Sequence, residues 1–226
     1  MSKQATWGSC RLLRSNATRI AAVLAAAMLI AATGGCGWLA YGLAGGKRKV
    51  NVKAQYLGLN NHSIAVLTLA DEYVLFEYPK APSLVTVAVS SRIAADVPGV
   101  TVMDPRQVVA YQNQNPYWAT LPDGELIRAL GVDRLVRIDL AQYRTHEPGN
   151  SHVWQGMATA NVSVIEADAP NPNNPVFRTT VESRFPEDTK IGVLNTNDQT
   201  IQLGLVKALA EAVSGLFHDH QIEVEP

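Results

Sequence analysis

The stretch Arg134–Tyr143, RLVRIDLAQY, decides the fold class of this chain. Its apolar residues largely alternate with polar ones, which is the pattern of a β-strand with one buried face. The residues predicted to supply the buried side are Leu135, Val136, Ile138 and Leu140. Because Arg137 and Asp139 point the other way, we expect the second face of this strand to be polar.

Four other segments are predicted to be strands. Val153–Ala167 (VWQGMATANVSVIEA) alternates over its whole length, and Val176–Phe185 (VFRTTVESRF) is its return strand. The Pro- and Asn-rich segment Ala169–Pro175 joins the two as a hairpin turn. Nearer the N-terminus, Ser63–Leu69 (SIAVLTL) predicts a buried strand and Val100–Met103 (VTVM) a short one.

Helices are predicted between these strands. The first begins with Ser83 as its N-cap and runs to about Asp96. Its apolar and small residues at helical spacing are Leu84, Val87, Ala88, Ser91 and Ala95. A second helix begins at Asp104-Pro105, because an acidic cap followed by proline is a typical helix start.

Two more helices complete the pattern. One begins at Asp123 and ends at Gly131, a residue that favours the left-handed turn after a helix. The last is capped by Asp198 and is amphipathic to about Leu216. This order of elements predicts an α/β (α+β) fold, one mixed sheet with helices packed on it, in a single domain over residues 60–222.

Residues 1–36 have the pattern of an export signal. Four basic residues precede Ile20–Ala32, an uninterrupted apolar run of the length of a signal-peptide hydrophobic region. Thr33, Gly34 and Gly35 lead to Cys36, which resembles the lipidation site of bacterial lipoproteins. That family prefers Leu where this chain has Thr33, so the match is imperfect. Lipidation of Cys36 would tie the protein to a membrane.

Two alternatives to a lipoprotein signal stay open, a single-span anchor and a plain cleaved signal. No charge occurs from Ile20 to Gly46, and about 20 apolar residues suffice to cross a bilayer. The many glycines after Thr33 disfavour a helix there. We therefore expect residues 37–59 to be a flexible basic linker.

Composition limits the function of the body. Without residues 1–36 the chain has 15 basic and 20 acidic residues, a net charge of about −5, which disfavours nucleic-acid binding. Both cysteines, Cys10 and Cys36, lie in the export segment. The folded body therefore has no disulfide, no thiolate nucleophile and no cysteine metal site.

The order of elements, together with Ala129–Asp133 (ALGVD) before a strand, resembles the N-terminal domain of the translocation protein TolB. It is also similar to the curli secretion lipoprotein CsgG and to lipoprotein activators of peptidoglycan synthases, over about residues 60–220. Tyr78-Pro79 and Asp104–Pro122 look like uncharacterised secreted lipoproteins of planctomycete-type bacteria. The resemblance implies a non-catalytic envelope domain that binds proteins or assembles.

Few residues form a candidate catalytic or metal site. The sequence contains no nucleophile elbow, phosphate loop or dinucleotide fingerprint, and it predicts no cofactor. His218-Asp219-His220 is the tightest histidine group, and we expect no metal there. The acids of Asp71–Tyr78 (Asp71, Glu72 and Glu77), in a segment expected to extend the first strand or form a loop, offer an alternative site for a small ligand or hydrolysis.

The expected function is therefore a non-enzymatic one. The chain is predicted to be a cell-envelope lipoprotein that faces the periplasm or exterior and acts in assembly or transport through contacts with an envelope protein. Tyr111, Tyr117 and Trp118 are the candidate interaction patch, because aromatic residues are enriched in interface cores. Homo-oligomerisation is left open, and a CsgG-like pore is disfavoured because the hairpin turn Ala169–Pro175 is short and polar.

Overall fold

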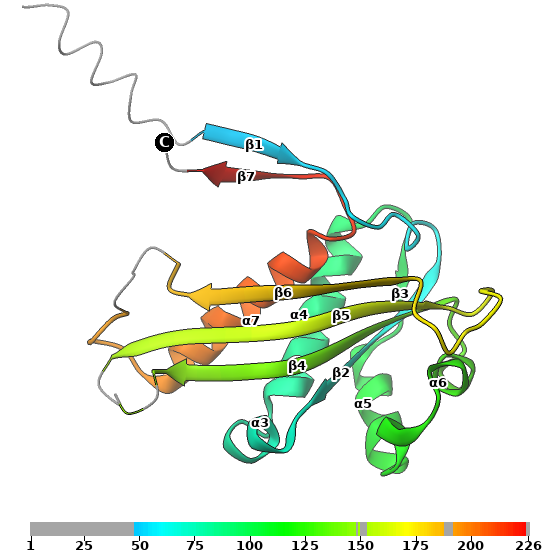
Figure 1. The fold of residues 1–226 in the computed structure, drawn as a ribbon, viewed down its shortest axis with the longest axis horizontal. Coiled ribbons are helices and arrows are strands. Elements are labelled where there is room, and N and C mark those ends of the chain that lie inside the picture. The colour runs from blue at the N-terminus through cyan, green and yellow to red at the C-terminus, as the bar shows by residue number, and fades with distance from the viewer. Residues whose placement is uncertain (1–47, 148, 150–152, 188–191, 225–226) are drawn as a thin grey trace, which may run out of the picture. The chain divides into compact units, whose positions relative to one another are not determined.

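The computed structural model describes residues 48–147, 149, 153–187 and 192–224 (Figure 1). Cys36 and the predicted export segment lie outside these residues. The elements in chain order are β1 (Arg48–Val52), β2 (Ser63–Ala70), α3 (Glu72–Glu77), α4 (Ala81–Asp96), β3 (Thr101–Val102), α5 (Pro105–Gln114), a 3-10 helix (Trp118–Thr120), α6 (Asp123–Leu130), β4 (Arg134–His146), β5 (Trp154–Glu166), β6 (Phe177–Phe185), α7 (Asp198–Ser214) and β7 (His220–Val224).

The central feature is a five-stranded mixed sheet in the order β3-β2-β4-β5-β6. β2 runs parallel to both β3 and β4, while β4–β5 and β5–β6 are antiparallel. The predicted α+β fold with one mixed sheet is therefore confirmed. The parallel β2–β4 pair requires a long crossover, and α3, α4, β3, α5 and α6 all lie within it.

Helices cover the two faces of the sheet unequally. α4 and α7 cover one face along its length, behind the strands in Figure 1, and form the larger core with the inward residues of β2, β4 and β5. α5 and α6 cover the other face only near β2 and the start of β4, where a smaller core forms. The rest of that second face of β4–β6 presents polar side chains to solvent.

The alternation of β4 differs from the prediction at one residue. Val136, Ile138 and Leu140 pack in the larger core, but Leu135 belongs to the smaller core under α6. Leu135 therefore shares a face with Arg137 and Asp139, as the period of two requires. β4 begins buried on both faces and becomes polar on one face only beyond the cover of α6.

Three helix starts also differ from the prediction. Asp71–Tyr78 is neither strand nor loop, because the Asp71 carboxylate accepts a hydrogen bond from the Val74 N–H and caps α3. α4 begins at Ala81, two residues before the predicted cap Ser83. In α7 the cap is Asn197, whose side chain accepts from the Thr200 N–H, and Asp198 is the first helical residue.

The chain divides into two compact units, and each is described by itself. The larger, Asn51–Gln221, contains the five-stranded sheet and its helices. The smaller includes residues 48–50 and 222–224, which are the outer parts of β1 and β7; these two strands pair as a two-stranded sheet. β1 lies within the predicted linker over residues 37–59. None of the described helices is long and apolar enough to span a bilayer.

Candidate functional site

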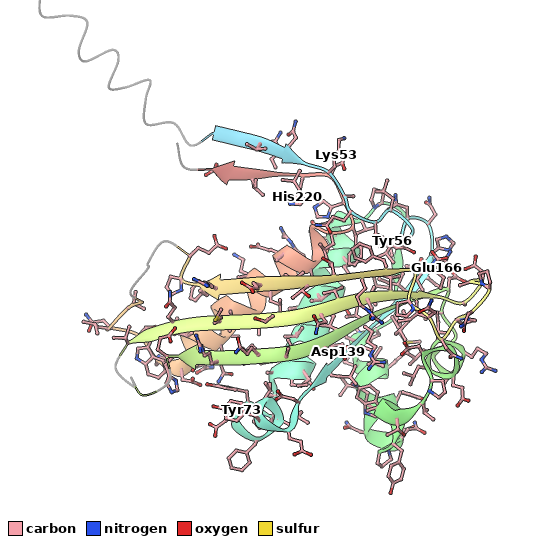
Figure 2. The ribbon with its side chains drawn as sticks, viewed as in Figure 1. Lys53, Tyr56, Tyr73, Asp139, Glu166 and His220 are labelled. Carbon is pink, nitrogen blue, oxygen red and sulfur yellow. The ribbon has the colours of Figure 1, made fainter. Side chains whose placement is uncertain are left out.

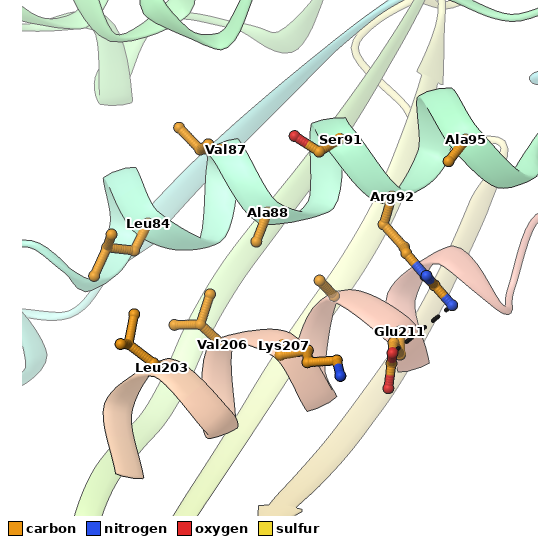
Figure 3. Close-up of a pocket in the computed structure, with 11 residues that line it drawn as sticks. Leu84, Val87, Ala88, Ser91, Arg92, Ala95, Leu203, Val206, Lys207 and Glu211 are labelled. Atoms are coloured by element: carbon orange, nitrogen blue, oxygen red, sulfur yellow. Dashed lines mark ion pairs between the residues drawn. The ribbon is translucent and has the colours of Figure 1, made fainter. Parts of the chain in front are cut away.

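An apolar groove runs between α4 and α7 on their outer side (Figure 3). The cavity measures about 500 Å³. Its residues on α4 are Leu84, Val87, Ala88, Ser91, Arg92 and Ala95, and those on α7 are Leu203, Val206, Lys207, Ala210 and Glu211. We call this set the α4–α7 groove.

The groove exists because α4 has two adjacent apolar stripes. Val85, Val89 and Ile93 are fully buried against the sheet. The apolar stripe predicted from the sequence, from Leu84 to Ala95, lies on the adjacent side of the helix. It lines the groove and does not face the sheet. A second apolar stripe that is not buried by the fold needs a partner surface or remains exposed to water.

The walls of the groove are exposed and its floor is not. Val87 is 43% and Leu203 is 55% exposed, whereas Val206 and Ala210 are almost completely buried. Small residues on both helices keep the space between the walls open, so an inserted side chain would contact apolar atoms on several sides.

Charged side chains lie at one end of the groove. Arg92 pairs with Asp96 at 3.0 Å on its own helix and reaches Glu211 on α7 at 3.7 Å. Lys207 also lines the groove, one turn before Glu211, and has no ion pair to another described residue. The exposed Lys207 ammonium is therefore available to an acidic group that approaches the groove.

The short helix α3 presents the opposite kind of surface, an exposed apolar projection. Tyr73 is 66%, Leu75 is 46% and Phe76 is 83% exposed, while only Val74 of this helix is buried. Figure 2 shows Tyr73 projecting from α3 away from the sheet. We call Tyr73, Leu75 and Phe76 the α3 patch.

The acids predicted as an alternative site flank the α3 patch. Asp71 is used as the helix cap, and Glu72 and Glu77 are exposed at the two ends of the helix. They line neither the α4–α7 groove nor a cavity on the sheet. This arrangement gives the α3 patch an acidic border.

The predicted aromatic patch is divided by the fold. Tyr111 and Trp118 pack against the smaller core, and Tyr117 is 79% exposed. Its role in interaction stays a prediction, with Tyr117 as its most accessible ring. The α3 patch was missed because its segment, EYVLFE, is rich in residues that favour strands and burial.

The histidine group near the C-terminus is used for local contacts. The Asp219 carboxylate binds Lys53 at 2.6 Å and accepts a hydrogen bond from the Ala54 N–H, and these contacts lower the pKa of Asp219. Nδ1 of His218 lies 2.9 Å from the Ser214 carbonyl oxygen. Among the residues that the structure describes, no three His, Cys, Asp or Glu side chains gather closely enough to hold a metal ion.

A buried arginine also has a structural explanation. Arg134, whose side chain is only 7% exposed, binds Asp168 at 2.6 Å and lies 3.5 Å from Glu166. The Tyr56 hydroxyl donates to Glu166, and burial together with this bond raises the pKa of Tyr56 (Figure 2). Because each charge here has a partner, this network fastens the segment before β2 to β4 and β5.

Neither a family model nor a curated protein sequence matches this chain. Solved structures with a similar fold include the PelC dodecamer from Paraburkholderia phytofirmans, at 10% identity, 76% coverage of this chain and 99% of that one, with a TM-score of 0.45. Another is lipoprotein GNA1162 from Neisseria meningitidis, at 15% identity, 68% and 98% coverage, and a TM-score of 0.42.

A third similar structure is a putative neuraminyllactose-binding hemagglutinin homolog from Helicobacter pylori. It is 10% identical to this chain, the match covers 72% of this chain and 88% of that one, and the TM-score is 0.37. These similar structures are bacterial, and one is a lipoprotein. The specific resemblance to TolB and CsgG stays a prediction. Scores this low carry no argument about function.

Proposed function

We propose that this protein is a lipid-anchored, non-catalytic component of the bacterial cell envelope that assembles by self-association. Insertion of the α3 patch of one copy into the α4–α7 groove of the next is the proposed contact. The observation that carries the proposal is that one chain exposes both an unpartnered apolar groove and an unpartnered aromatic projection. The pattern ending in Cys36 supports the location at a membrane.

Charge complementarity supports a second copy as the occupant of the groove. The α3 patch is bordered by Glu72 and Glu77, and the groove contains Lys207. Apolar insertion would therefore bring opposite charges together at the rim, which favours the correct orientation. At one end of the groove Arg92 is shared between Asp96 and Glu211, so Lys207 is the groove cation without an ion pair to another described residue.

The expected strength of this contact fits a tethered protein. Burying one exposed Phe or Tyr contributes about 1.5–3 kcal/mol, and association costs several kcal/mol of lost translational and rotational freedom. The contact is therefore weak between free molecules. A shared membrane raises the effective concentration of copies and makes a weak contact sufficient. Because the two surfaces differ, the contact is heterologous and builds rings or chains of copies.

The test is the oligomeric state of the full-length protein, purified in detergent and measured by analytical ultracentrifugation after mild cross-linking. Phe76→Ala removes the most exposed ring of the α3 patch, and Leu203→Asp places a charge on the exposed wall of the groove. Each variant alone is expected to reduce oligomers at least tenfold. Leu57→Ala is the control, because it removes an exposed apolar side chain that belongs to neither the α3 patch, the α4–α7 groove nor the predicted aromatic patch.

Mixing the two defective variants gives the sharper result. Phe76→Ala keeps an intact groove and Leu203→Asp keeps an intact α3 patch, so their mixture should form heterodimers but no larger species. A mixture that stays monomeric contradicts a heterologous contact between these surfaces. A wild-type protein that is monomeric in micelles and in lipid vesicles overturns self-association. A loss of oligomers in Leu57→Ala as large as in Phe76→Ala overturns the assignment of the two surfaces.

A further inference from the structure

A polar cavity of about 440 Å³ opens on the face of the sheet opposite α4 and α7. It lies over β4, β5 and β6, beside the first residue of α6, where Asp123 reaches the strand residues. Figure 2 marks Asp139, one of the residues that line it. We call this cavity the sheet pocket. It shares no residue with the α3 patch or the α4–α7 groove, so it does not rest on the proposed function.

Strand register places the lining side chains in two rows. Arg137 is opposite Ser163, and Ser163 is opposite Arg178, so these three lie in one row across the sheet. The next row on the same face begins with Asp139 and Asn161. With strands about 4.8 Å apart, the backbones of Arg137 and Arg178 are separated by about 10 Å, with a serine hydroxyl between them.

The two arginines differ in how they are held. Arg137 donates to Asp123 at 2.7 Å and to Asp139 at 3.4 Å, and the Asp123 carboxylate is only 11% exposed. These bonds fix the Arg137 guanidinium and neutralise it. Arg178 is exposed and has no ion pair to another described residue. Arg178 is therefore the lining cation without an ion pair to another described residue, and it shares the pocket with one carboxylate charge more than Arg137 neutralises.

We propose that the sheet pocket binds a small polar monocarboxylate, with the carboxylate on Arg178 and hydroxyl or amine donors directed at Asp139. Oδ1 of Asn161 already accepts from the Thr180 hydroxyl at 2.8 Å, so Asn161 offers its amide N–H groups. A guanidinium binds a carboxylate through two parallel hydrogen bonds. The cavity has the volume of a small-ligand site, and its polar lining suits a hydroxylated molecule. Asp123 and Asp139 disfavour a doubly charged anion, because both carboxylates line the same pocket and repel a second negative charge on the ligand.

Sugar acids and amino acids both have this chemistry, so the experiment uses one of each. The full-length protein in detergent is titrated by isothermal calorimetry with D-glucuronate and with L-threonine. D-glucose lacks the carboxylate, and glucose 6-phosphate replaces it with a dianion. We expect at least one of the two monocarboxylates to bind at least tenfold more tightly than both glucose and glucose 6-phosphate. The affinity should fall with added salt, because the guanidinium is exposed.

Variants locate the binding. Arg178→Gln is expected to weaken the monocarboxylate at least tenfold, and Ser163→Ala a few fold. Arg184→Gln is the matched control, since Arg184 is exposed on the same strand and the same face but outside the pocket. The proposal is overturned if neither monocarboxylate binds, if glucose binds equally well, or if Arg184→Gln weakens binding as much as Arg178→Gln. Unchanged melting temperatures confirm that the variants are folded.

Discussion

At the scale of single residues, Asp133 connects the starts of two parallel strands. Its carboxylate accepts hydrogen bonds from the Ser63 hydroxyl at 2.7 Å and from the Ser63 N–H at 2.9 Å. The side-chain bond is the larger cause, and together these bonds lower the pKa of Asp133 from its ordinary value of 3.8. This is the Asp of the segment ALGVD, which the sequence marked as characteristic without indicating what it binds.

Ser63→Ala tests this contact. The variant keeps the backbone donor and loses the hydroxyl, so the pKa of Asp133 should rise toward 3.8. A depressed carboxylate pKa stabilises the fold above the ordinary pKa, and that contribution is lost as the pH falls through the lowered value. Carboxyl NMR titration measures the pKa, and urea unfolding should show a deficit in the variant that narrows below about pH 4.

The exposed serine at the start of α4 provides the control. Ser83→Ala should leave the pKa of Asp133 where it is, because Ser83 is exposed on α4, whereas the contact of Asp133 joins the starts of β2 and β4. An unchanged pKa in Ser63→Ala, or a stability deficit that grows as the pH falls, would contradict the assigned role of the hydroxyl.

At the scale of elements, predictions from sequence succeeded where a short stretch of sequence has a clear secondary-structure signal. The long strands were found from alternation, α5 from the Asp104-Pro105 start, and the end of α6 from Gly131, whose φ is 66°. α3 was missed because its helical state depends on the Asp71 cap and on packing of Val74, not on its own residue preferences. The α4–α7 groove could not be predicted because it arises from two helices that are far apart in the sequence.

Packing of α7 on β6 gives a prediction at this scale. A Cβ atom at Gly204 would overlap the ring of Phe185. Replacing a helical glycine by alanine gains up to about 1 kcal/mol of helix preference. Forcing extra volume into a packed contact costs about 1–3 kcal/mol. We expect Gly204→Ala to lower the free energy of unfolding by about 1 kcal/mol in urea denaturation.

Phe185→Leu distinguishes the clash from other effects of the alanine. In that background the ring is absent, so Gly204→Ala should become neutral or stabilising. If Gly204→Ala lowers the free energy of unfolding by the same amount in the Phe185→Leu background, the stability of α7 does not depend on this close approach to β6.

At the scale of the whole molecule, anchoring and assembly make separable predictions. The sequence predicts lipidation at Cys36, and the α3 patch and α4–α7 groove lie in the domain that follows it. If tethering supplies the effective concentration for a weak contact, then loss of the anchor should reduce assembly although both contact surfaces are intact. Loss of the α3 patch should reduce assembly although the anchor is intact.

Cys36→Ser and Phe76→Ala, expressed at equal levels in cells, test the two parts. Metabolic labelling with a clickable fatty acid should mark the wild type and Phe76→Ala but not Cys36→Ser, and Cys10→Ser is the matched control that keeps its label. Lysine cross-linking in intact cells should give fewer oligomers for both Cys36→Ser and Phe76→Ala.

An unlabelled wild type, or label that persists in Cys36→Ser, contradicts lipidation at Cys36 and does not test the contact surfaces. If an unlabelled, membrane-free Cys36→Ser protein assembles fully, the contact is strong enough without the membrane. That result contradicts the weak contact expected from the burial of two aromatic rings.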